Sequence, residues 1–417
     1  MILVQNHRLL SSGSKIVAFF ACLVVLGACS PKVLRSSKPK DGQVVVEEKD
    51  KSGEKNKSEE KPVEEKAIVF NDIALILPFQ LHKVSQVPSK ADVDRAALAL
   101  DFYQGFKMGI DQLAVNGNNF RLNILDSRDN TVEVQRLAAS KEVQQAQLIV
   151  GPVFPTEINA FSNTAKLTGK LQISPLAARS PSGYQMNNLV TVTPPIDIHA
   201  KAIADFIAKD IDTGDKVVII NNNDDDSKKF LAPLKEALNM HHVPFNEVSA
   251  MPDIEPNLAA TGKNLVVAGA TNPFFISPLL VELNKLKTES AYSISLIGHP
   301  NWVKLDLDRG YLMALNTCIS SSFYVNDQDA ATKQFIATYQ SLYRVAPSEF
   351  AFKGYDTGVY FGRLLAKYPK DYARKLIDAK YRGLSIGFDF INEPNAGFVN
   401  NRITLLRISN NGFTPFR

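Results

Sequence analysis

Side chains that can bind a small molecule recur directly after short apolar runs of this sequence. Hydroxyl and guanidinium groups such as those of Thr156, Ser174 and Arg179 can hold a polar or anionic group, whereas the ring of Trp302 can stack on a flat one. Arg179 could instead be a solvated loop charge, and Trp302 could instead pack at the rim of a lobe. The complete set of candidate ligand-binding residues is Phe79, Gln80, Val153, Thr156, Ser174, Ala177, Arg179, Asn221, Asp224, Thr271, Asn272, His299, Asn301 and Trp302.

Metal and catalytic chemistry find less support. The segment 221–226, NNNDDD, could offer oxygens to a hard cation, but it lacks the alternating spacing of a calcium loop, so a polar turn is favoured. His241 and His242 have no nearby Cys or spaced His to complete a metal site, which favours an exposed loop pair. The sequence carries no serine-hydrolase elbow, zinc-protease motif or phosphate-binding glycine loop. We therefore expect a non-enzyme without catalytic residues, metal or cofactor, although a triad assembled in space stays open.

The N-terminus predicts export and lipidation. Arg8 and Lys15 precede an apolar run of about eleven residues, IVAFFACLVVL, which is about half the length of a membrane span. The next residues, LGAC, resemble the bacterial lipobox, in which the Cys sulfur is diacylglycerated and the chain is cut before that Cys. We therefore expect 1–28 to be a lipoprotein signal peptide and Cys29 to be the lipid anchor. A plain secretory signal or an uncleaved anchor is the alternative.

The cysteine count, the composition and the net charge exclude several classes of protein and limit the roles of the cysteines. Removal of Cys22 and lipidation of Cys29 would leave Cys318 alone, so we expect no internal disulfide and a buried Cys318, with a catalytic thiol as the alternative. The 417 residues are 45% hydrophobic and 22% charged, which excludes collagen, coiled-coil and disulfide-scaffold classes. The net charge of +4 indicates no nucleic-acid partner.

Residues 29–70 are expected to form a disordered charged linker. Lys and Glu alternate there with Pro, Ser and Gly, and aromatic residues are almost absent. Such a segment buries too little apolar surface to offset its ordering entropy. The linker would hold the remaining chain away from a membrane.

The rest of the chain predicts an α/β fold. Short apolar runs expected to be strands occur at 72–79, 120–125, 146–150 and 171–175, and helical spacing occurs between them. Gly105 and Gly109 should let one helix approach the sheet closely. The pattern restarts with a helix at 198–207 and strands at 216–220, 265–268 and 293–297. Two consecutive sets of this kind indicate two Rossmann-like lobes with parallel sheets.

The order of these segments resembles the type 1 periplasmic-binding fold of the branched-chain amino-acid binding proteins that serve ABC importers. The segments that carry the resemblance are IALILPF, LDFYQGFKMGID, NILDSRDN, LIVGPVFPTE, LQISPLA, KVVIINNNDDD, LVVAGATNP, LIGHPNW and KQFIATYQSLYRVAPSEFAFKGYDTGVYFGRLL. The later segment GFVNNRITLLRI is similar to a Bacteroidetes branch of lipoproteins often linked to peptidoglycan-binding modules. Lipoprotein activators of penicillin-binding proteins use a related domain.

The resemblance implies a ligand cleft between the lobes, at the carboxyl ends of the strands. Lobe one would comprise 72–194 plus 320–380, and lobe two 195–319 plus 381–417. The chain would cross between them at 193–195, 320–322 and 383–387.

Several ligand positions of the amino-acid binders differ here. The resemblance aligns their ligand-binding Thr with Ala178, their Asp-Tyr-Gly with 225–227, and their paired Tyr before Pro with 271–273. A site that loses hydrogen-bond partners loses affinity, so an amino-acid ligand is disfavoured.

We therefore expect a lipid-anchored protein of the bacterial cell envelope that faces the periplasm, with the outer or inner membrane left open. It would bind a small polar solute as a substrate-binding component of an ABC permease, or as a sensor. The alternative is a non-catalytic cell-wall regulator or scaffold that binds a peptidoglycan synthase or a glycan.

Overall fold

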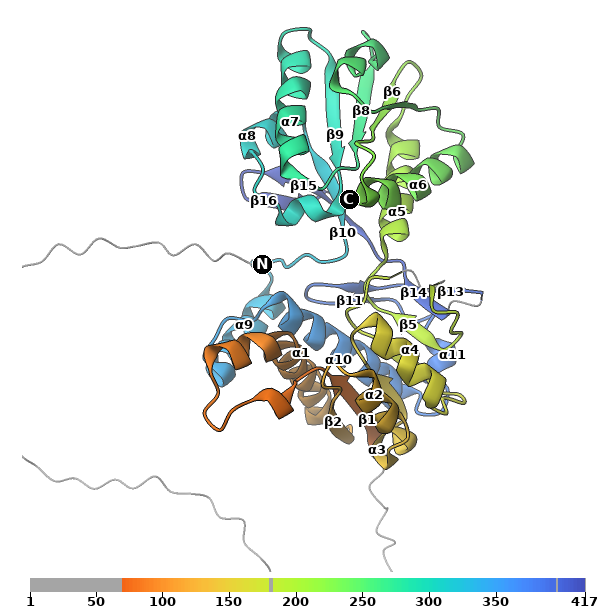
Figure 1. Ribbon diagram of the computed structural model, residues 1–417, viewed down its shortest axis with the longest axis vertical. Helices are drawn as coiled ribbons and strands as arrows, with labels where there is room; N and C mark the ends of the chain where they lie inside the picture. Colours follow the sequence, from red (N-terminus) through yellow and green to blue (C-terminus); the bar gives the residue numbers. More distant parts are fainter. Residues whose placement is uncertain (1–69, 180–182, 395–396, 417) are drawn as a thin grey trace, which may run out of the picture. The chain divides into compact units, whose positions relative to one another are not determined.

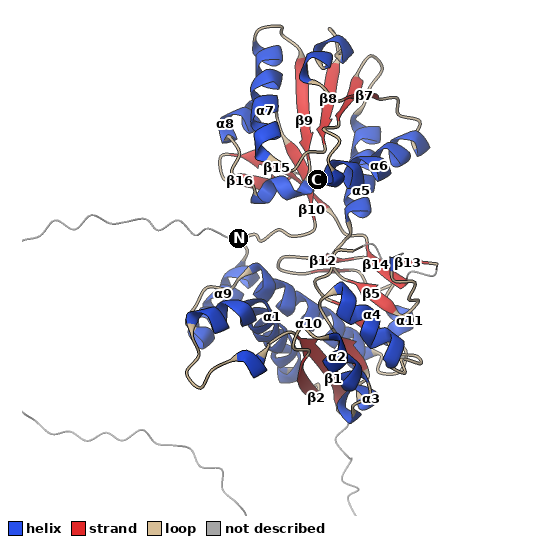
Figure 2. Cartoon of the chain, in the orientation of Figure 1, coloured by secondary structure: helices blue, strands red, loops and turns tan. Residues whose placement is uncertain are grey.

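The computed structural model describes residues 70–179, 183–394 and 397–416. The predicted signal peptide, lipidated Cys29 and nearly all of the predicted linker lie outside these residues. Within them, the strands form two large sheets and one small hairpin, and helices flank both large sheets (Figures 1 and 2). This arrangement confirms the predicted α/β fold with two lobes of mostly parallel strands.

The first sheet has the strand order β13-β14-β5-β4-β3-β1-β2. Its strands are β1 (Asn71–Leu77), β2 (Phe120–Asp126), β3 (Leu148–Val150), β4 (Gln172–Ser174), β5 (Leu189–Thr191), β13 (Phe390–Glu393) and β14 (Gly397–Asn400). The pairs from β14 to β2 are all parallel, and β13 runs antiparallel to β14.

Both faces of the first sheet are covered by helices. Residues of β1 alternate between two cores: Ile73 and Leu75 pack with the helices α1 and α10, whereas Ala74 and Ile76 pack with α2, α3 and α4. A strand buried on both faces is continuously apolar, which explains the run that marked it in the sequence. The helices of this lobe are α1 (Lys90–Val115), α2 (Thr131–Ala138), α3 (Lys141–Gln145), α4 (Pro155–Thr164), α9 (Ala330–Tyr343), α10 (Glu349–Lys367) and α11 (Tyr372–Lys375).

The second sheet has the strand order β16-β15-β10-β9-β8-β6-β7. Its strands are β6 (Lys216–Ile220), β7 (Asn246–Val248), β8 (Lys263–Ala268), β9 (Ser293–Gly298), β10 (Cys318–Ser321), β15 (Thr404–Ser409) and β16 (Gly412–Pro415). Helices α5 (Ile196–Asp210) and α6 (Asp225–Met240) cover one face, and α7 (Pro273–Thr288) and α8 (Arg309–Ala314) cover the other. Cys318 is buried in this core, as the sequence predicts.

Strand pairing corrects the predicted lobe boundaries near the C-terminus. Residues 381–417 were assigned to lobe two, but β14 pairs with β5 through Phe398 and Val190, so β13 and β14 belong to the first sheet. The third crossing therefore lies at 401–403, between β14 and β15. Ser320 and Ser321, assigned to lobe one, belong to β10 in the second sheet. The glycines at 383 and 387 are not a crossing, because they belong to the hairpin of β11 (Tyr381–Arg382) and β12 (Gly387–Phe388).

Glycines govern how two helices of the first lobe pack. The prediction that Gly105 and Gly109 face the sheet is wrong: α1 and α10 lie side by side (Figure 1), and these glycines face α10. A Cβ at Gly105 would lie 1.9 Å from the Ala351 carbonyl oxygen, and one at Gly354 would lie 2.1 Å from the Phe102 carbonyl oxygen. The two backbones therefore approach so closely that only glycine fits at the crossing.

In the described part of the chain, none of the helices has the length and apolar character that crossing a membrane requires.

Candidate functional site

A cavity of about 500 Å³ is lined by residues of both lobes. Strand-end loops and crossings supply most of the lining: Ala178, Thr193, Pro194, Ile196, His199, Asp226, Lys229, His299, Pro300, Asn301, Val303, Lys304, Ser320, Ser321, Ser322, Phe323, Glu349 and Lys353. The predicted crossings 193–195 and 320–322 both contribute to it. We call this space the inter-lobe cavity.

Two buried histidines form one wall of the inter-lobe cavity. The Nδ1 of His199, on α5, lies 3.1 Å from the Oγ of Ser320 on β10. His299 follows β9, and its Nδ1 accepts a hydrogen bond from the backbone N–H of Asn301 at 3.1 Å. Because Nδ1 of His299 is an acceptor, a neutral His299 carries its proton on Nε2. Phe230 packs edge-on against the His299 ring at 5.1 Å, which holds that ring in place.

Burial keeps both histidines neutral. Desolvation lowers the pKa of His199 to about 4, and the neighbouring His299 adds to the effect. Desolvation also lowers the pKa of His299 to about 4, although Asp226 and Asp224 oppose the change. At neutral pH these rings therefore offer hydrogen-bond donors and acceptors to a ligand rather than positive charge.

Ion pairs link the charged side chains at the cavity. On α10, Lys353 binds the Glu349 carboxylate, and Lys304 of the other lobe approaches the same carboxylate at 3.8 Å. Burial raises the pKa of Glu349, but the Lys353 ammonium outweighs burial, so the net shift is downward and the carboxylate stays charged. On α6, Lys229 lies 3.6 Å from Asp226. The lining thus presents three ammonium groups and two carboxylates.

Only part of the predicted site reaches the cavity. His299 and Asn301 line it, together with Ala178, which the resemblance aligned with a ligand-binding Thr. Phe79 and Val153 are instead buried in the first core at 5% and 4% exposure, respectively. The residues that follow these two strands pack in the core. The prediction that Phe79 and Val153 contact a ligand is therefore wrong.

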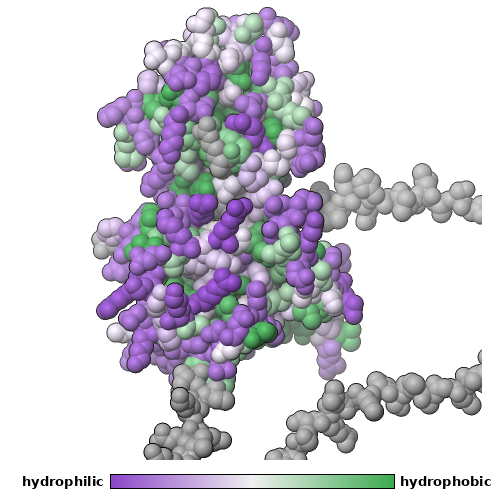
Figure 3. All heavy atoms as spheres, turned by 180° about the vertical axis from the view of Figure 1, so that it is seen from behind, coloured by the Kyte–Doolittle hydropathy of each residue, from purple (hydrophilic) through white to green (hydrophobic). Residues whose placement is uncertain are grey.

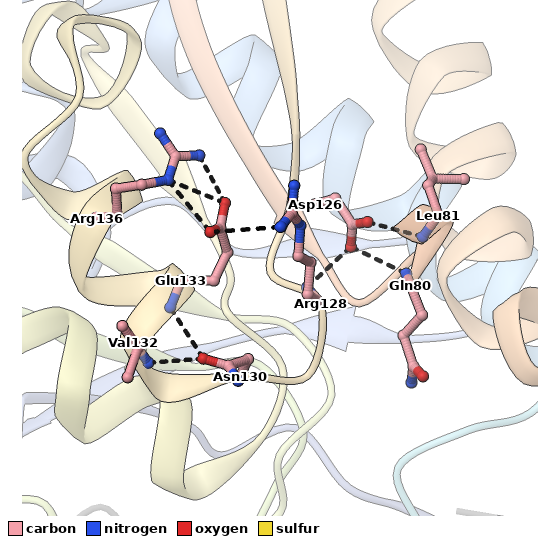
Figure 4. Close-up of polar contacts among 8 residues, drawn as sticks. All are labelled: Gln80, Leu81, Asp126, Arg128, Asn130, Val132, Glu133 and Arg136. Atoms are coloured by element: carbon pink, nitrogen blue, oxygen red, sulfur yellow. Dashed lines mark hydrogen bonds and ion pairs between the residues drawn. The ribbon is translucent and has the colours of Figure 1, made fainter. Parts of the chain in front are cut away.

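Gln80 contacts the end of the neighbouring strand β2 and does not line the inter-lobe cavity. Its backbone has a left-handed φ of 54°, and Asp126 accepts hydrogen bonds from the backbone N–H groups of Gln80, Leu81 and Arg128 (Figure 4). Its side-chain oxygen accepts a bond from Lys83 at 2.8 Å.

Helix capping fixes the segment after β2. Asn130 caps α2 by accepting from the backbone N–H groups of Val132 and Glu133 (Figure 4). Polar groups that follow the strands of lobe one thus bind the backbone of their own lobe.

The polar residues after β6 and β8 behave in the same way. Asp224 caps α6 by accepting from the backbone of Ser227 at 2.7 Å, and Asn272 caps α7 by accepting from Phe274 at 3.0 Å. Asn221 donates to Glu247 at 2.7 Å, and the Thr271 hydroxyl lies 3.3 Å from Asp226. These contacts favour the polar-turn interpretation of 221–226 over a cation site. The predicted residues Asn221, Asp224, Thr271 and Asn272 do not line the inter-lobe cavity, whereas Asp226 does.

The remaining predicted residues of lobe one surround β4. Ser174 is 1% exposed, and its hydroxyl has no hydrogen-bond partner among the described residues. Thr156 is exposed on α4, and Ala177 packs beside a small core. The guanidinium of Arg179 lies 5.3 Å from the ring centre of Tyr184, which is a cation–π contact. None of the four lines the inter-lobe cavity.

Trp302 is not a stacking platform for a ligand. Its side chain is 1% exposed within the second core, and its Nε1 donates to the Ala270 carbonyl at 2.8 Å. The prediction of a ligand-facing Trp302 is therefore wrong. The alternative, packing at the rim of a lobe, is right that the ring packs, but the ring lies inside the second core rather than at a rim.

Sequence reasoning missed several residues of the lining, notably His199, Thr193, Ser320 and Lys353. The first three lie at or beside the predicted crossings, so a crossing is itself a signal for cavity residues. Lys353 carried no such signal, since α10 reaches the cavity only through the tertiary fold. Further along α10, which begins after its cap Ser348, Asp356 is buried in the helix interior.

Apolar side chains are scattered over the solvent-facing surface of the described residues. The face shown in Figure 3 has hydrophobic residues interspersed among hydrophilic ones. Single exposed apolar residues such as Val132 and Phe274 are ordinary for globular proteins.

Comparison with solved structures identifies the same fold. A proposed branched-chain amino acid ABC transporter protein from Rhodospirillum rubrum aligns with a TM-score of 0.62 at 14% identity, covering 84% of this chain and 100% of that one. A branched-chain amino acid transporter protein from Rhodopseudomonas palustris aligns at 0.57, with 12% identity and coverage of 83% and 96%. A substrate-binding protein from Desulfitobacterium hafniense in complex with Leu aligns at 0.50, with 17% identity and coverage of 82% and 99%.

Sequence comparison is more specific about the family. No curated protein matches the chain. The sequence profile of the family described as periplasmic binding protein matches residues 94–412, which is most of the chain and spans both lobes. This chain belongs to the periplasmic binding protein family.

Proposed function

We propose that this protein binds a small polar solute in the inter-lobe cavity as the substrate-binding component of an ABC-type importer or of a sensor. The observation that carries the proposal is that strand ends and crossings of both lobes line one cavity of about 500 Å³. In open α/β sheets, ligands bind at the carboxyl ends of the strands. A ligand held by both lobes would also favour their closure around it.

The lining favours a solute with an anionic group beside a polar or modestly apolar body. Ammonium groups outnumber carboxylates there, and the hydroxyls of Thr193 and Ser322 can donate to an oxygen. Phe323, Ile196 and Val303 supply apolar contact. Leucine is present in one similar structure, but Ala178 stands where the amino-acid binders place a Thr, which argues for a different solute here.

Native mass spectrometry of the purified protein tests the proposal. A retained small molecule, or a mass shift with one member of a metabolite panel that includes leucine and other carboxylates, is the expected result. Ala178→Trp should abolish that shift because it fills the cavity, whereas Val132→Trp, on the surface of α2, should preserve it. Failure of every solute to bind would contradict solute capture and favour the regulatory alternative.

We also propose that Cys29 anchors the protein to a membrane of the cell envelope. The lipobox-like LGAC supports this proposal, since acylation of the Cys gives a stable anchor. Cys29→Ser should release the protein into the soluble fraction and remove the acyl mass. A variant that remains membrane-bound and processed would contradict the anchor.

A further inference from the structure

A second set of cavities lies around the β11–β12 hairpin. Three cavities of about 770, 330 and 220 Å³ all include Tyr381 in their linings. Only Ser322 belongs both to these linings and to the inter-lobe cavity. We call this set the Tyr381 groove, and its cationic lining residues are Arg363, Lys367, Lys375, Lys380, Arg382 and Arg402.

The guanidinium groups of the groove lack carboxylate partners within the described residues. Lys375 and Lys380 pair with Asp378 and Asp389 at 3.8 and 2.9 Å, but no ion pair involves Arg363, Arg382 or Arg402 in the described ranges. The Asp329 carboxylate also lines the groove.

The Asp329 carboxylate already accepts a hydrogen bond from its own lobe. It caps α9 by accepting a hydrogen bond from the backbone N–H of Thr332 at 3.0 Å. The six cationic side chains of the lining outnumber its three carboxylates, which belong to Asp329, Asp378 and Asp389, so positive charge is in excess here. Planar guanidinium groups suit carboxylate or phosphate oxygens.

A buried carboxylate holds the hairpin in shape. Asp356 accepts hydrogen bonds from the backbone N–H groups of Leu384, Ser385 and Ile386 at 2.7, 2.8 and 3.0 Å, and from the Ser385 hydroxyl at 2.7 Å. Asp356 is fully buried, so these donors replace its water. The hairpin side of the groove is thus fixed before any ligand arrives, which lowers the entropic cost of binding.

Aromatic rings accompany the cations. Tyr324, Tyr355 and Tyr381 are half-buried in the groove lining, and the Arg363 guanidinium lies 5.4 Å from the ring centre of Tyr381. The Tyr355 hydroxyl donates to Gln112 at 2.6 Å, which orients that ring. Tyrosine rings contribute an apolar face and a polar edge, and both suit the C–H faces and hydroxyls of a sugar.

Other polyanions fit this surface less well. A membrane surface needs apolar side chains beside the cations. None of the exposed large apolar side chains among the described residues lines the Tyr381 groove. An acidic peptide strand needs a long free sheet edge, but β11 and β12 are two residues each.

We propose that the Tyr381 groove binds an acidic oligosaccharide, with Arg363, Arg382 and Arg402 contacting its carboxylate or phosphate groups. This binding is separate from solute capture in the inter-lobe cavity. The three adjoining cavities accommodate an extended chain of sugar units, and the tyrosines contact the sugar rings.

Calorimetric titration with tetragalacturonate, which carries one carboxylate per sugar, tests the proposal. Binding is expected at low salt and should weaken in high salt. The double variant Arg382→Gln/Arg402→Gln should lose about tenfold or more in affinity, since hydrogen bonds to charged groups are lost. Lys209→Gln/Lys228→Gln, which removes two exposed cations of lobe two, should bind as the wild type does.

Further titrations separate binding in the groove from binding elsewhere on the protein. Ala178→Trp should leave tetragalacturonate binding intact while it blocks the inter-lobe cavity, so the two proposals fail independently. No binding of tetragalacturonate would overturn the proposal, as would equal binding of neutral maltotetraose or equal losses in the two double variants. Stronger binding to tetraglutamate or to phosphatidylglycerol vesicles would overturn it in favour of a peptide or a membrane.

Discussion

The two lobes share the order of their five parallel strands but use the ends of these strands differently. In both sheets five parallel strands precede two C-terminal strands, yet β14 runs parallel to β5 whereas β15 runs antiparallel to β10. Lobe two places His299 and Asn301, which follow β9, and Asp226, in the first turn of α6, at the inter-lobe cavity. In lobe one, Phe79 and Val153 occupy the corresponding kind of loop but are buried in the core. Equivalent topology therefore fixes where a site can form, not which side chains form it.

In lobe one, the helix α10 also contributes to the site. Glu349 and Lys353 reach the inter-lobe cavity from the first turns of α10, and the position of α10 depends on its close crossing with α1. The lobe-one side of the site thus combines this helix packing with Ala178 and Thr193, which follow β4 and β5, whereas lobe two lines the cavity from α5, α6 and the segment after β9.

The largest expected effect on the free energy of unfolding comes from a substitution at the crossing of α1 and α10. Gly354→Val places a side chain against the Phe102 carbonyl, so we expect at least several kcal/mol of destabilisation or failure to fold. Urea unfolding measures it. Gly310→Val is the matched control, because the added Cβ meets only the Asp308 side chain. A Gly354→Val protein as stable as the control would break the proposed difference between the lobes.

Truncation of a large side chain in the second core should have the next largest effect on stability. Trp302→Ala removes a fully buried ring and its hydrogen bond to Ala270, which should cost about 3–5 kcal/mol. Trp302 is the only tryptophan, so its fluorescence in the wild-type protein should report a dry core and red-shift on unfolding of lobe two. Efficient quenching of folded Trp302 by acrylamide would restore the ligand-facing interpretation.

Low pH should reduce the stability of the protein because the buried His199 binds a proton less readily in the folded state than in the unfolded chain. The unfolded chain takes up a proton near pH 6.5, whereas folded His199 does so only near pH 4, so stability present above pH 6.5 is lost as the pH falls toward 4. The loss attributable to His199 approaches about 3 kcal/mol. His199→Gln should flatten unfolding free energy measured between pH 7 and 4.5. An equal flattening in the exposed control His82→Gln would contradict this assignment.

The smallest effect concerns the ion pair that links the lobes. Lys304 is largely exposed and lies 3.8 Å from Glu349, so Lys304→Ala should change the unfolding free energy by less than about 1 kcal/mol. Solute affinity should change modestly and in a salt-dependent way. Lys333→Ala, on the surface of α9, is the control. A loss of several kcal/mol in Lys304→Ala would mean that this pair, rather than core packing, holds the lobes together.

The sequence predicted the buried parallel strands of the two lobes. It missed the strands whose place in the fold is set only by pairing with a distant strand. Continuous apolar runs such as 73–77 and 216–220 identified buried parallel strands because burial on both faces requires them. Strands β13 and β14 are short and mixed in character, and only their pairing with β5 reveals which lobe they join.

Site residues were harder to predict for a physical reason. Polar residues after strands serve two purposes, helix capping and ligand binding, and the sequence does not distinguish Asp224, which caps α6, from Asp226, which lines the cavity. His299 and Asn301 were found by the strand-end rule. Lys353 and Glu349 lie on a helix far along the chain, so only tertiary structure brings them to the site. The lipid anchor and the Bacteroidetes-like branch stay predictions.

Calorimetric titration of Ala178→Trp against the wild type tests the central claim most directly, with the solute that native mass spectrometry identifies. Ala178 lies on the lining and is exposed, so the indole should fill the cavity without disturbing a core. We predict that Ala178→Trp loses about 100-fold or more in affinity while the Val132→Trp control binds as the wild type does, since a filled cavity excludes the solute. Wild-type affinity in Ala178→Trp would contradict solute binding between the lobes.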